Sequence, residues 1–214
     1  HKKSYEIICS LLFNGIKIKH IFAANKVKLN FKKSKKRDFV RGLNFPKIKQ
    51  ICKSHRIKYL NIQHNSKKLL KILNKEKFDL GIIAGARILN SPVIKSFKIG
   101  ILNTHKGLLP DNRGLDTIKW AILKNIPQGV TSHLINEKID LGKIISKKKI
   151  RIYKDDNLTD INERLQNTEL SLLIKSLYKL KAKKNFMNVY SKNKSHSSMP
   201  KNLEEIMIKK FEKY

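Results

Sequence analysis

Short apolar runs alternate with amphipathic stretches along most of the chain, and this alternation constrains the fold more than any other feature of the sequence. The runs that read as strands are residues 16–23, 57–62, 78–84, 99–103, 130–135 and 143–152. The stretches with helical spacing are residues 5–12, 46–55, 66–73, 116–123, 158–180 and 203–211. Strands that alternate with helices are typical of βαβ units around a parallel sheet. We therefore expect an α/β fold with a doubly wound, mostly parallel sheet, in which residues 78–84 form the central strand and the last two strands form an antiparallel pair.

The chain opens with a helical pattern, although a doubly wound sheet normally opens with a strand. His1-Lys2-Lys3-Ser4 then resembles the end of a strand-to-helix loop, so we expect the first strand to be missing from this chain. Residues 27–44 are basic and polar without a sustained period, which predicts a surface loop. Toward its end the sequence becomes rich in Lys, Asn and Ser. This shift predicts a main domain over residues 1–182 and a basic tail with a short helix over residues 183–214.

Length and composition exclude several classes of protein. With 214 residues, 40% of them hydrophobic, the chain is long enough for one globular domain with a substantial core. It has no run of about 18 uncharged apolar residues and no signal cleavage site, so neither a membrane span nor a secretory signal is expected. Cys9 and Cys52 lack the spacing of a disulfide framework or a zinc site. We expect a cytoplasmic protein without membrane contact and without a metal.

The net charge of +32 comes from 48 Lys and Arg residues against 16 Asp and Glu residues. Such a charge suits a polyanionic partner. However, 41 of the 48 basic residues are lysines, they are spread over almost every segment, and few aromatic residues accompany them. Nucleic-acid-binding surfaces favour arginine forks and interleaved aromatic side chains. The sequence therefore leaves open whether the charge is functional or compositional, and nucleic acid is not the expected partner.

Three polar residues stand at or just beyond the ends of expected strands: Asn103, His105 and Asp140. Ligands of open α/β sheets bind in the crevice at the carboxyl ends of the strands. Asn103 and His105 are two residues apart, so in extended backbone they share one face. An amide donor beside an imidazole can stabilise an oxyanion, and a nearby carboxylate can relay a proton. These residues are the candidate catalytic group.

An ordered set of motifs surrounds these three residues. It comprises Asn103-Thr104-His105, Leu108-Leu109-Pro110, Arg113-Gly114, Trp120-Ala121-Ile122, Gly129-Val130-Thr131-x-His133 and Ile139-Asp140-x-Gly142-x-Ile144-Ile145. As a set, the motifs resemble the folate-dependent formyltransferase family, whose members formylate glycinamide ribonucleotide, methionyl-tRNA or nucleotide-linked amino sugars. The resemblance is close over residues 78–145 and looser over residues 4–180. It implies a Rossmann-like formyltransferase fold, with residues 1–182 as the catalytic domain.

The resemblance implies an enzyme that transfers a formyl group from 10-formyltetrahydrofolate to a primary amine, without a metal. It assigns catalysis to Asn103, His105 and Asp140: Asn103 and a protonated His105 hold the oxyanion, and Asp140 keeps His105 charged. The residues that it implies in folate binding are Arg87, Ile88, Leu89, Leu109 and Asp140. The residues that it implies in acceptor binding are Lys106, Gly107, Arg113 and His133.

Some of these residues also have a purely structural interpretation. Leu109 could pack in the core, Arg113 could be a solvated turn residue, and His133 could be a hydrogen-bonded structural histidine. Trp120 is interpreted as a buried anchor of its helix. The sequence alone does not decide among these roles.

Departures from the family pattern narrow the choice of acceptor. Lys106-Gly107 stands where most members have Pro-Ser or a similar pair, and Arg113-Gly114-Leu115-Asp116 is closer to members that formylate amino sugars on nucleotide carriers. We therefore expect a phosphorylated or nucleotide-linked amine acceptor. Glycinamide ribonucleotide and methionyl-tRNA remain alternatives, although the methionyl-tRNA enzymes carry an additional C-terminal barrel domain for which the residues after Leu180 are too few. A non-catalytic, basic nucleic-acid-binding protein is the alternative of another class, and a homodimer is left open.

Overall fold

The computed structural model of the protein describes residues 2–25, 46–85, 88–182, 186–191 and 193–212. By its internal contacts the chain divides into two compact units, with the change between residues 101 and 102. The loop expected at residues 27–44 lies outside the described residues. Each unit is described below by itself.

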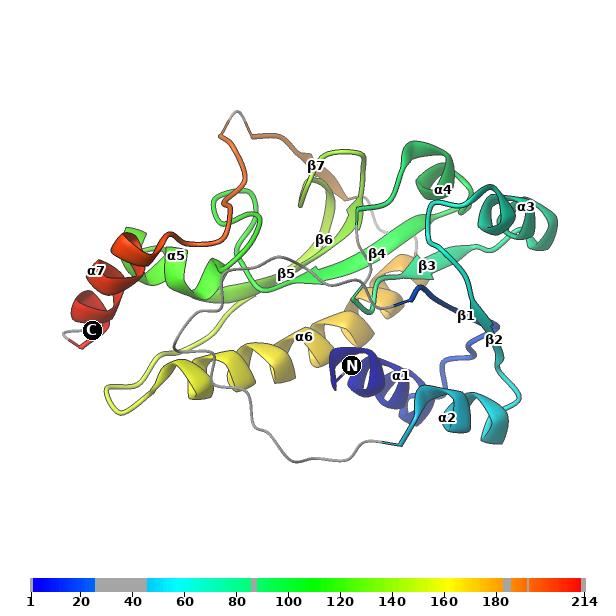
Figure 1. Ribbon diagram of the computed structural model, residues 1–214, viewed down its shortest axis with the longest axis horizontal. Helices are drawn as coiled ribbons and strands as arrows, with labels where there is room; N and C mark the ends of the chain where they lie inside the picture. Colours follow the sequence, from blue (N-terminus) through cyan, green and yellow to red (C-terminus); the bar gives the residue numbers. More distant parts are fainter. Residues whose placement is uncertain (1, 26–45, 86–87, 183–185, 192, 213–214) are drawn as a thin grey trace. The chain divides into compact units, whose positions relative to one another are not determined.

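The first unit contains a two-stranded parallel sheet and the helices around it (Figure 1). Its elements are α1 (Lys2–Phe13), β1 (His20–Ala23), α2 (Ile48–Ser54), β2 (Lys58–Asn61), α3 (Lys67–Glu76), β3 (Leu80–Ile82) and α4 (Ser91–Lys95). Strands β1 and β2 pair in parallel, with His20 opposite Lys58 and Ala23 opposite Asn61. Each of these helices and strands overlaps the matching expected range, apart from α4, which the sequence pattern did not indicate.

Local signals explain where these helices begin and end. The Ser66 side chain accepts the backbone N–H of Leu69 and caps α3, and the Asn90 side chain accepts the N–H of Val93 and caps α4. Such caps satisfy backbone donors that have no partner within the helix. After the C-terminal end of α1 the chain turns at Gly15, whose φ of +67° suits glycine.

The second unit contains most of a separate five-stranded sheet, whose strand order is β3-β4-β5-β6-β7. Its elements are β4 (Gly100–His105), α5 (Thr117–Lys124), β5 (Gly129–Ile135), β6 (Gly142–Lys149), α6 (Leu158–Lys181), β7 (Met187–Val189) and α7 (Lys201–Phe211). The pairings β4–β5, β5–β6 and β6–β7 are all antiparallel. The α/β class is confirmed, but the antiparallel part extends well beyond the single pair that we expected. It includes β4, which the sequence assigned to the parallel part.

A short connection accounts for the β5–β6 pairing. Only residues 136–141 join the two strands, and a connection of this length cannot carry the chain back for a parallel crossover. Gly142 begins β6 with a φ of +121°, and a Cβ atom there would lie 2.1 Å from the backbone oxygen of Leu134. The close approach of the two strands at this point therefore requires glycine.

The long helix α6 lies along β5 and β6 and covers the core of the second unit (Figure 1). Val130 of β5 packs with Ile161, Leu165 and Leu172 of α6, and each of these side chains is almost fully buried. The apolar residues of α6 recur at helical spacing on one face, which is the pattern that predicted this helix. Burial of this face holds β5 against α6.

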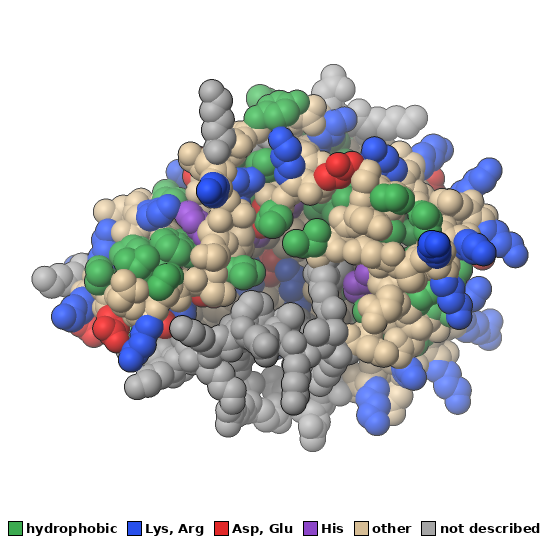
Figure 2. Space-filling view, turned by 45° about the horizontal axis from the view of Figure 1, so that its top comes forward, with side chains coloured by type: hydrophobic (Ala, Val, Ile, Leu, Met, Phe, Trp, Pro, Cys, Tyr) green, Lys and Arg blue, Asp and Glu red, His purple; other side chains and the backbone are tan. Residues whose placement is uncertain are grey.

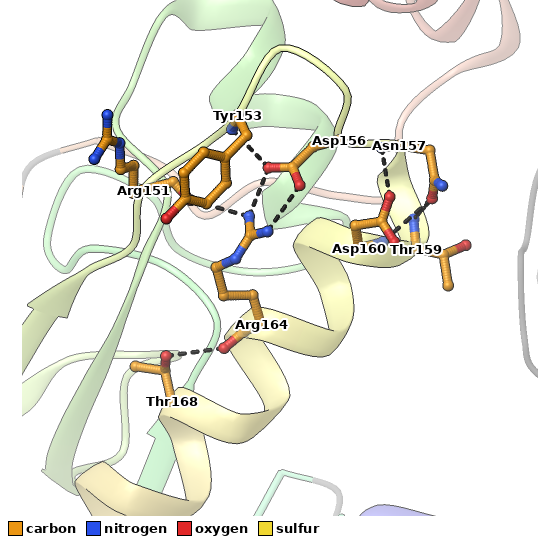
Figure 3. Close-up of polar contacts among 8 residues, drawn as sticks. All are labelled: Arg151, Tyr153, Asp156, Asn157, Thr159, Asp160, Arg164 and Thr168. Carbon is orange, nitrogen blue, oxygen red and sulfur yellow. Dashed lines mark hydrogen bonds and ion pairs between the residues drawn. The ribbon is translucent and has the colours of Figure 1, made fainter.

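Polar contacts fix the start of α6 (Figure 3). The side chain of Asn157 accepts the N–H groups of Thr159 and Asp160, and Asp160 accepts the N–H of Asn157 in return. Arg164 forms two hydrogen bonds with Asp156, of 2.6 and 2.8 Å, and its guanidinium lies 4.8 Å from the centre of the Tyr153 ring. The guanidinium beside Asp156 lowers the pKa of that carboxyl group. The turn before α6 is thereby tied to the first turns of the helix.

A second apolar cluster joins α7 to α5. Ile122 and Met207 are fully buried and Met199 nearly so, with Trp120 and Leu203 packed around them. The helix expected at residues 203–211 is thus present as α7 and begins two residues earlier. Through Met199 and Met207, residues 199–211 pack against α5 in the second unit.

The basic side chains are spread over the visible surface. Figure 2 shows Lys and Arg scattered over this face, with few Asp or Glu side chains among them. Among the helices that the structure describes, none is long and apolar enough to cross a membrane.

Candidate active site

Strand β4 presents Asn103 and His105 beside strand β5. In the register of the two strands, Asn103 lies opposite His133 and His105 lies opposite Thr131. Residues two apart on a strand project from the same face. The sheet therefore brings the two expected catalytic residues of β4 to one side, next to a histidine and a threonine of β5.

Both ring nitrogens of His105 face protein groups. Nε2 lies 2.9 Å from the backbone oxygen of Asn112, and because a carbonyl oxygen only accepts, Nε2 carries the hydrogen. Nδ1 lies 3.5 Å from Oδ1 of Asp140, within ion-pair distance. The side chains of His105 and Asp140 are 10% and 16% exposed, so the pair lies just beneath the surface.

A backbone N–H holds the second carboxylate oxygen of Asp140. Asp140 lies in the connection between β5 and β6 with a φ of +48°, in the left-handed region that Asp adopts more readily than most residues. The N–H of Gly114 donates to Oδ2 at 2.9 Å, while Oδ1 faces His105. The three expected catalytic residues Asn103, His105 and Asp140 are thus brought together in the second unit.

His133 orients the Asn103 side chain. Nδ1 of His133 lies 3.2 Å from the backbone oxygen of Leu141, so Nδ1 carries the hydrogen and Nε2 is left as an acceptor. Nδ2 of Asn103 lies 3.3 Å from that Nε2 and donates to it, which fixes the direction of the amide. One N–H of the Asn103 amide is used in this contact.

Burial keeps His133 neutral. Desolvation lowers its pKa to about 4; the Asp140 carboxylate opposes this shift and the nearby His105 adds to it. The side chain has no exposed surface. This burial does not fit the direct acceptor contact expected for His133, and it agrees with the structural alternative.

The loop after β4 is built around the His105 ring. A Cβ atom on Gly107 would lie 2.3 Å from the Asn112 oxygen and 2.7 Å from Nε2 of His105. The hydroxyl of Thr131 donates to the Gly107 oxygen and accepts the N–H of Leu109. Gly107 therefore leaves room for the histidine. Leu109, expected in folate binding, is buried at 1% exposure and agrees with the core alternative.

Lys106 and Arg113 were expected at the acceptor, and their contacts within the protein are well defined. Lys106 donates to the Asn162 side chain at 2.7 Å and lies 3.8 Å from the buried carboxylate of Glu169, both on α6. Arg113 is 7% exposed and donates to the backbone oxygens of Ile139 and Asn193. These contacts turn both cations toward other parts of the second unit.

Residues 87–89, the expected folate-binding segment, belong to the first unit. Arg87 lies outside the described residues, Ile88 is 69% exposed, and Leu89 is half-buried. The Asn65 side chain donates to the Ile88 oxygen and accepts the N–H of Asn90, each at 3.0 Å. Asn65 thus clamps the backbone on either side of Leu89.

A hollow of about 540 Å³ lies beside this clamp. It is lined by Ala24, Gln63, His64, Asn65, Ser66 and Ile88. Sequence reasoning missed the lining residues Gln63, His64, Asn65 and Ser66 for this role, although a polar run shortly after a strand was visible. The described residues contain no group of His, Cys, Asp and Glu that could hold a metal ion.

Sequence comparison assigns most of the chain to a family. Residues 7–177 match the formyl transferase family model. Methionyl-tRNA formyltransferase of Chlorobium chlorochromatii is 31% identical over 120 residues, which are 56% of this chain and 38% of the relative. The enzyme of the same name from Thermodesulfovibrio yellowstonii is 31% identical over 150 residues, 66% of this chain and 47% of the relative. The chain therefore spans less than half the length of these relatives.

Solved structures show the same fold. Phosphoribosylglycinamide formyltransferase from Bacillus halodurans superposes with a TM-score of 0.64 at 23% identity, covering 85% of this chain and 91% of that one. The formyltransferase PseJ from Anoxybacillus kamchatkensis was solved with UDP-4,6-dideoxy-4-formamido-L-AltNAc and tetrahydrofolate. It gives a TM-score of 0.56 at 25% identity, covering 76% of this chain and 87% of that one. The resemblance seen in the sequence is confirmed, and the chain belongs to the formyl transferase family.

Proposed function

We propose that this chain transfers a formyl group from 10-formyltetrahydrofolate to a primary amine. The observation that carries the proposal is the meeting of Asn103, His105 and Asp140 at one side of β4, in a chain of the formyl transferase family. An amide donor, an imidazole and a carboxylate are the groups that acyl transfer to an amine requires. Family membership favours this enzymatic role over the non-catalytic, nucleic-acid-binding alternative.

Asn103 supplies the donor for the formyl oxygen. When the amine adds to the formyl carbon, negative charge develops on that oxygen, and a preorganised donor stabilises it. One N–H of the Asn103 amide is fixed on Nε2 of His133. The second N–H of the same group is the one that we assign to the formyl oxygen.

We assign to His105 and Asp140 the stabilisation of the oxyanion charge and the transfer of protons during the reaction. The Nε2 hydrogen of His105 is directed to the Asn112 oxygen, so the ring contributes to oxyanion stabilisation through its charge rather than through this N–H. Asp140 faces Nδ1 and stabilises the protonated ring. As the amine loses its proton and the bond from the formyl carbon to the folate nitrogen breaks, a proton moves to that nitrogen, and the His105–Asp140 pair assists this transfer.

The folate supplies the activated formyl group, and we assign its binding to the 87–89 segment of the first unit. The exposed apolar side chain of Ile88 lies beside a hollow that is also lined by the polar side chains of Gln63 and His64. An apolar face with polar groups at its edge suits a flat heterocycle such as a pterin. The tetrahydrofolate in the PseJ structure supports a folate in this family member.

The acceptor that we propose is a nucleotide-linked amino sugar. This proposal is supported by the likeness to PseJ, whose structure contains a UDP-linked formamido sugar. The positive charge of the chain would attract such a polyanion. Glycinamide ribonucleotide and methionyl-tRNA, the acceptors named for other relatives, are the alternatives.

An acceptor panel tests the proposed function. The protein is incubated with 10-formyltetrahydrofolate and, in turn, a UDP-linked 4-amino sugar, glycinamide ribonucleotide and methionyl-tRNA, and formylated product is measured by mass spectrometry. We expect product with the amino sugar. Product with either other acceptor would correct the acceptor assignment. A folded protein that forms no product and shows no tetrahydrofolate binding by calorimetry at millimolar ligand would contradict the proposed function.

A further inference from the structure

We propose that residues 193–199, which we call the C-terminal segment, position Asp140 by holding the backbone of Arg113 and Gly114. This inference rests on the proposed function, because it assigns the segment a role in the reaction of Asp140. The segment is about fifty residues away from Asp140 in the sequence, and nothing in its composition indicates such a role. Three sets of contacts support the proposal.

The first contact is a backbone bridge. The N–H of His196 donates to the Arg113 oxygen at 2.8 Å, and the N–H of Leu115 donates to the His196 oxygen at 2.9 Å. These two bonds form a parallel β-bridge between Gly114 and His196. In such a bridge the N–H of the central residue points away from its partner. The N–H of Gly114 points to Oδ2 of Asp140, at 2.9 Å.

Gly114 is fitted to this bridge. Its φ is +97°, and a Cβ atom would lie 2.2 Å from the backbone oxygen of His196. Any other residue would therefore clash with the C-terminal segment while adopting an unfavourable backbone conformation. The backbone of the C-terminal segment thus packs directly against the backbone of Gly114, which donates to Asp140.

The second contact is the guanidinium of Arg113. It donates to the oxygen of Ile139, the residue before Asp140, at 3.1 Å, and to the oxygen of Asn193 in the C-terminal segment. One rigid fork thereby ties the segment to the backbone next to the carboxylate. Asp140 is held on one side through its carboxylate oxygen and on the other through its preceding peptide.

The third set of contacts anchors the C-terminal segment itself. The indole N–H of Trp120 donates to the Ser197 oxygen at 2.9 Å, and the indole stacks on the His196 ring with 4.7 Å between centroids. The N–H of Met199 donates to Oδ2 of Asp116 at 3.0 Å, and the Met199 side chain is buried in the cluster between α5 and α7. The segment is therefore fixed independently of Asp140 and can transmit this position to it.

Arg113→Lys provides the main test, with Arg151→Lys, an exposed arginine, as the matched control. Lysine keeps the charge, but one ammonium cannot reproduce the fork between the two carbonyl oxygens. With the acceptor identified in the panel, we expect the kcat of Arg113→Lys to fall by about tenfold or more, while the acceptor KM and the tetrahydrofolate Kd stay within about twofold. A raised acceptor KM with an unchanged kcat would overturn the inference and make Arg113 an acceptor ligand.

A spectroscopic measurement needs no substrate. The ¹⁵N chemical shifts of the His105 ring, measured at a fixed pH of 7, report on its contact with Asp140. We expect them to move in Arg113→Lys and to stay in place in Arg151→Lys. If they respond while the wild-type protein formylates no acceptor, the proposed function fails and the positioning role stands. If they do not respond in a folded variant, the positioning role is wrong, whatever the activity.

Trp120→Phe serves as the second variant should Arg113→Lys fail to fold. Phenylalanine keeps an aromatic ring against His196 but loses the hydrogen bond to the Ser197 oxygen. We expect the same His105 shifts to move in the same direction by a smaller amount. Unchanged His105 shifts in a folded Trp120→Phe protein would likewise count against the C-terminal segment as a positioning element.

Discussion

The site on β4 and the loop after β3 hold their proposed functional residues by different means. Around β4, strand register and buried hydrogen bonds fix each group, and both His133 and Thr131 have no exposed surface. In the first unit, Ile88 is largely exposed and its loop is clamped by the exposed side chain of Asn65. A buried hydrogen bond is costly to leave unpaired, whereas an exposed one is readily replaced by water. The groups that we propose to act on the transition state are thus held by buried contacts, whereas Ile88, in the proposed folate segment, is held by exposed ones.

Asn103→Asp should give the largest effect at the buried site. The substitution keeps the shape of the side chain but removes both N–H donors and adds a negative charge where one develops in the reaction. We expect kcat to fall by about 10²–10³-fold, the loss typical of one oxyanion donor. Asn188→Asp, at an exposed position of β7, is the matched control and should retain activity. An Asn103→Asp enzyme within about tenfold of wild type would remove the amide from the proposed mechanism.

His133 should make the free energy of unfolding depend markedly on pH, through its burial at the β4 site. Its pKa is about 4 when folded, against an ordinary value of 6.5, so the unfolded chain binds more protons between these values. The contribution of the buried neutral His133 to the free energy of unfolding is complete above pH 6.5. It falls by about 3 kcal/mol as the pH decreases to 4. Urea unfolding of wild type and His133→Gln across this range measures it. Parallel pH profiles for the two proteins would show that His133 is not buried in its neutral form.

Glycine substitutions compare the two units directly. Gly107→Ala places a Cβ atom against the Asn112 oxygen and the His105 ring, and we expect a loss of about 1–3 kcal/mol in unfolding free energy together with lower kcat. Gly15→Ala, in the first unit, meets no atom within 4 Å but keeps a φ of +67°. It should cost about 1 kcal/mol from backbone strain alone and leave kcat unchanged. Equal kcat values for the two variants would argue against close packing around His105.

Asn65→Ala should give the smallest effect. Loss of the two exposed hydrogen bonds that clamp residues 88–90 should weaken tetrahydrofolate binding by about 3- to 10-fold, with kcat unchanged at saturating folate. Asn61→Ala removes another exposed asparagine of the first unit and serves as the control in calorimetry. If Asn65→Ala binds tetrahydrofolate as tightly as wild type does, the clamp has no part in folate binding.

The sequence predicted the elements that follow from local pattern. The apolar spacing over residues 158–180 matches α6, and the separation of Asn103 and His105 by two residues matches their common strand. Both patterns reflect nearest-neighbour geometry, which the sequence contains directly. Such features need no knowledge of the rest of the chain.

Long-range contacts could not be predicted in this way. Arg113 donates to the backbone oxygens of Ile139 and Asn193, and Gly114 forms a β-bridge with His196. Both contacts depend on how distant segments pack. The extended antiparallel part of the sheet also escaped prediction, because the period of a strand does not encode its direction. The family resemblance implied His133 at the acceptor, and its complete burial is a long-range property that the sequence did not show.

His105→Asn tests the central claim most directly, namely that the pair on β4 and its carboxylate perform formyl transfer. Asparagine keeps a hydrogen-bond donor but carries no charge and takes up no proton. With the acceptor found in the panel, we expect kcat to fall by at least about 10²-fold, while the tetrahydrofolate Kd changes by less than about threefold. His55→Asn, at an exposed histidine after α2, should match wild type. An active His105→Asn enzyme with wild-type kcat, or one whose entire loss lies in folate affinity, would contradict the account.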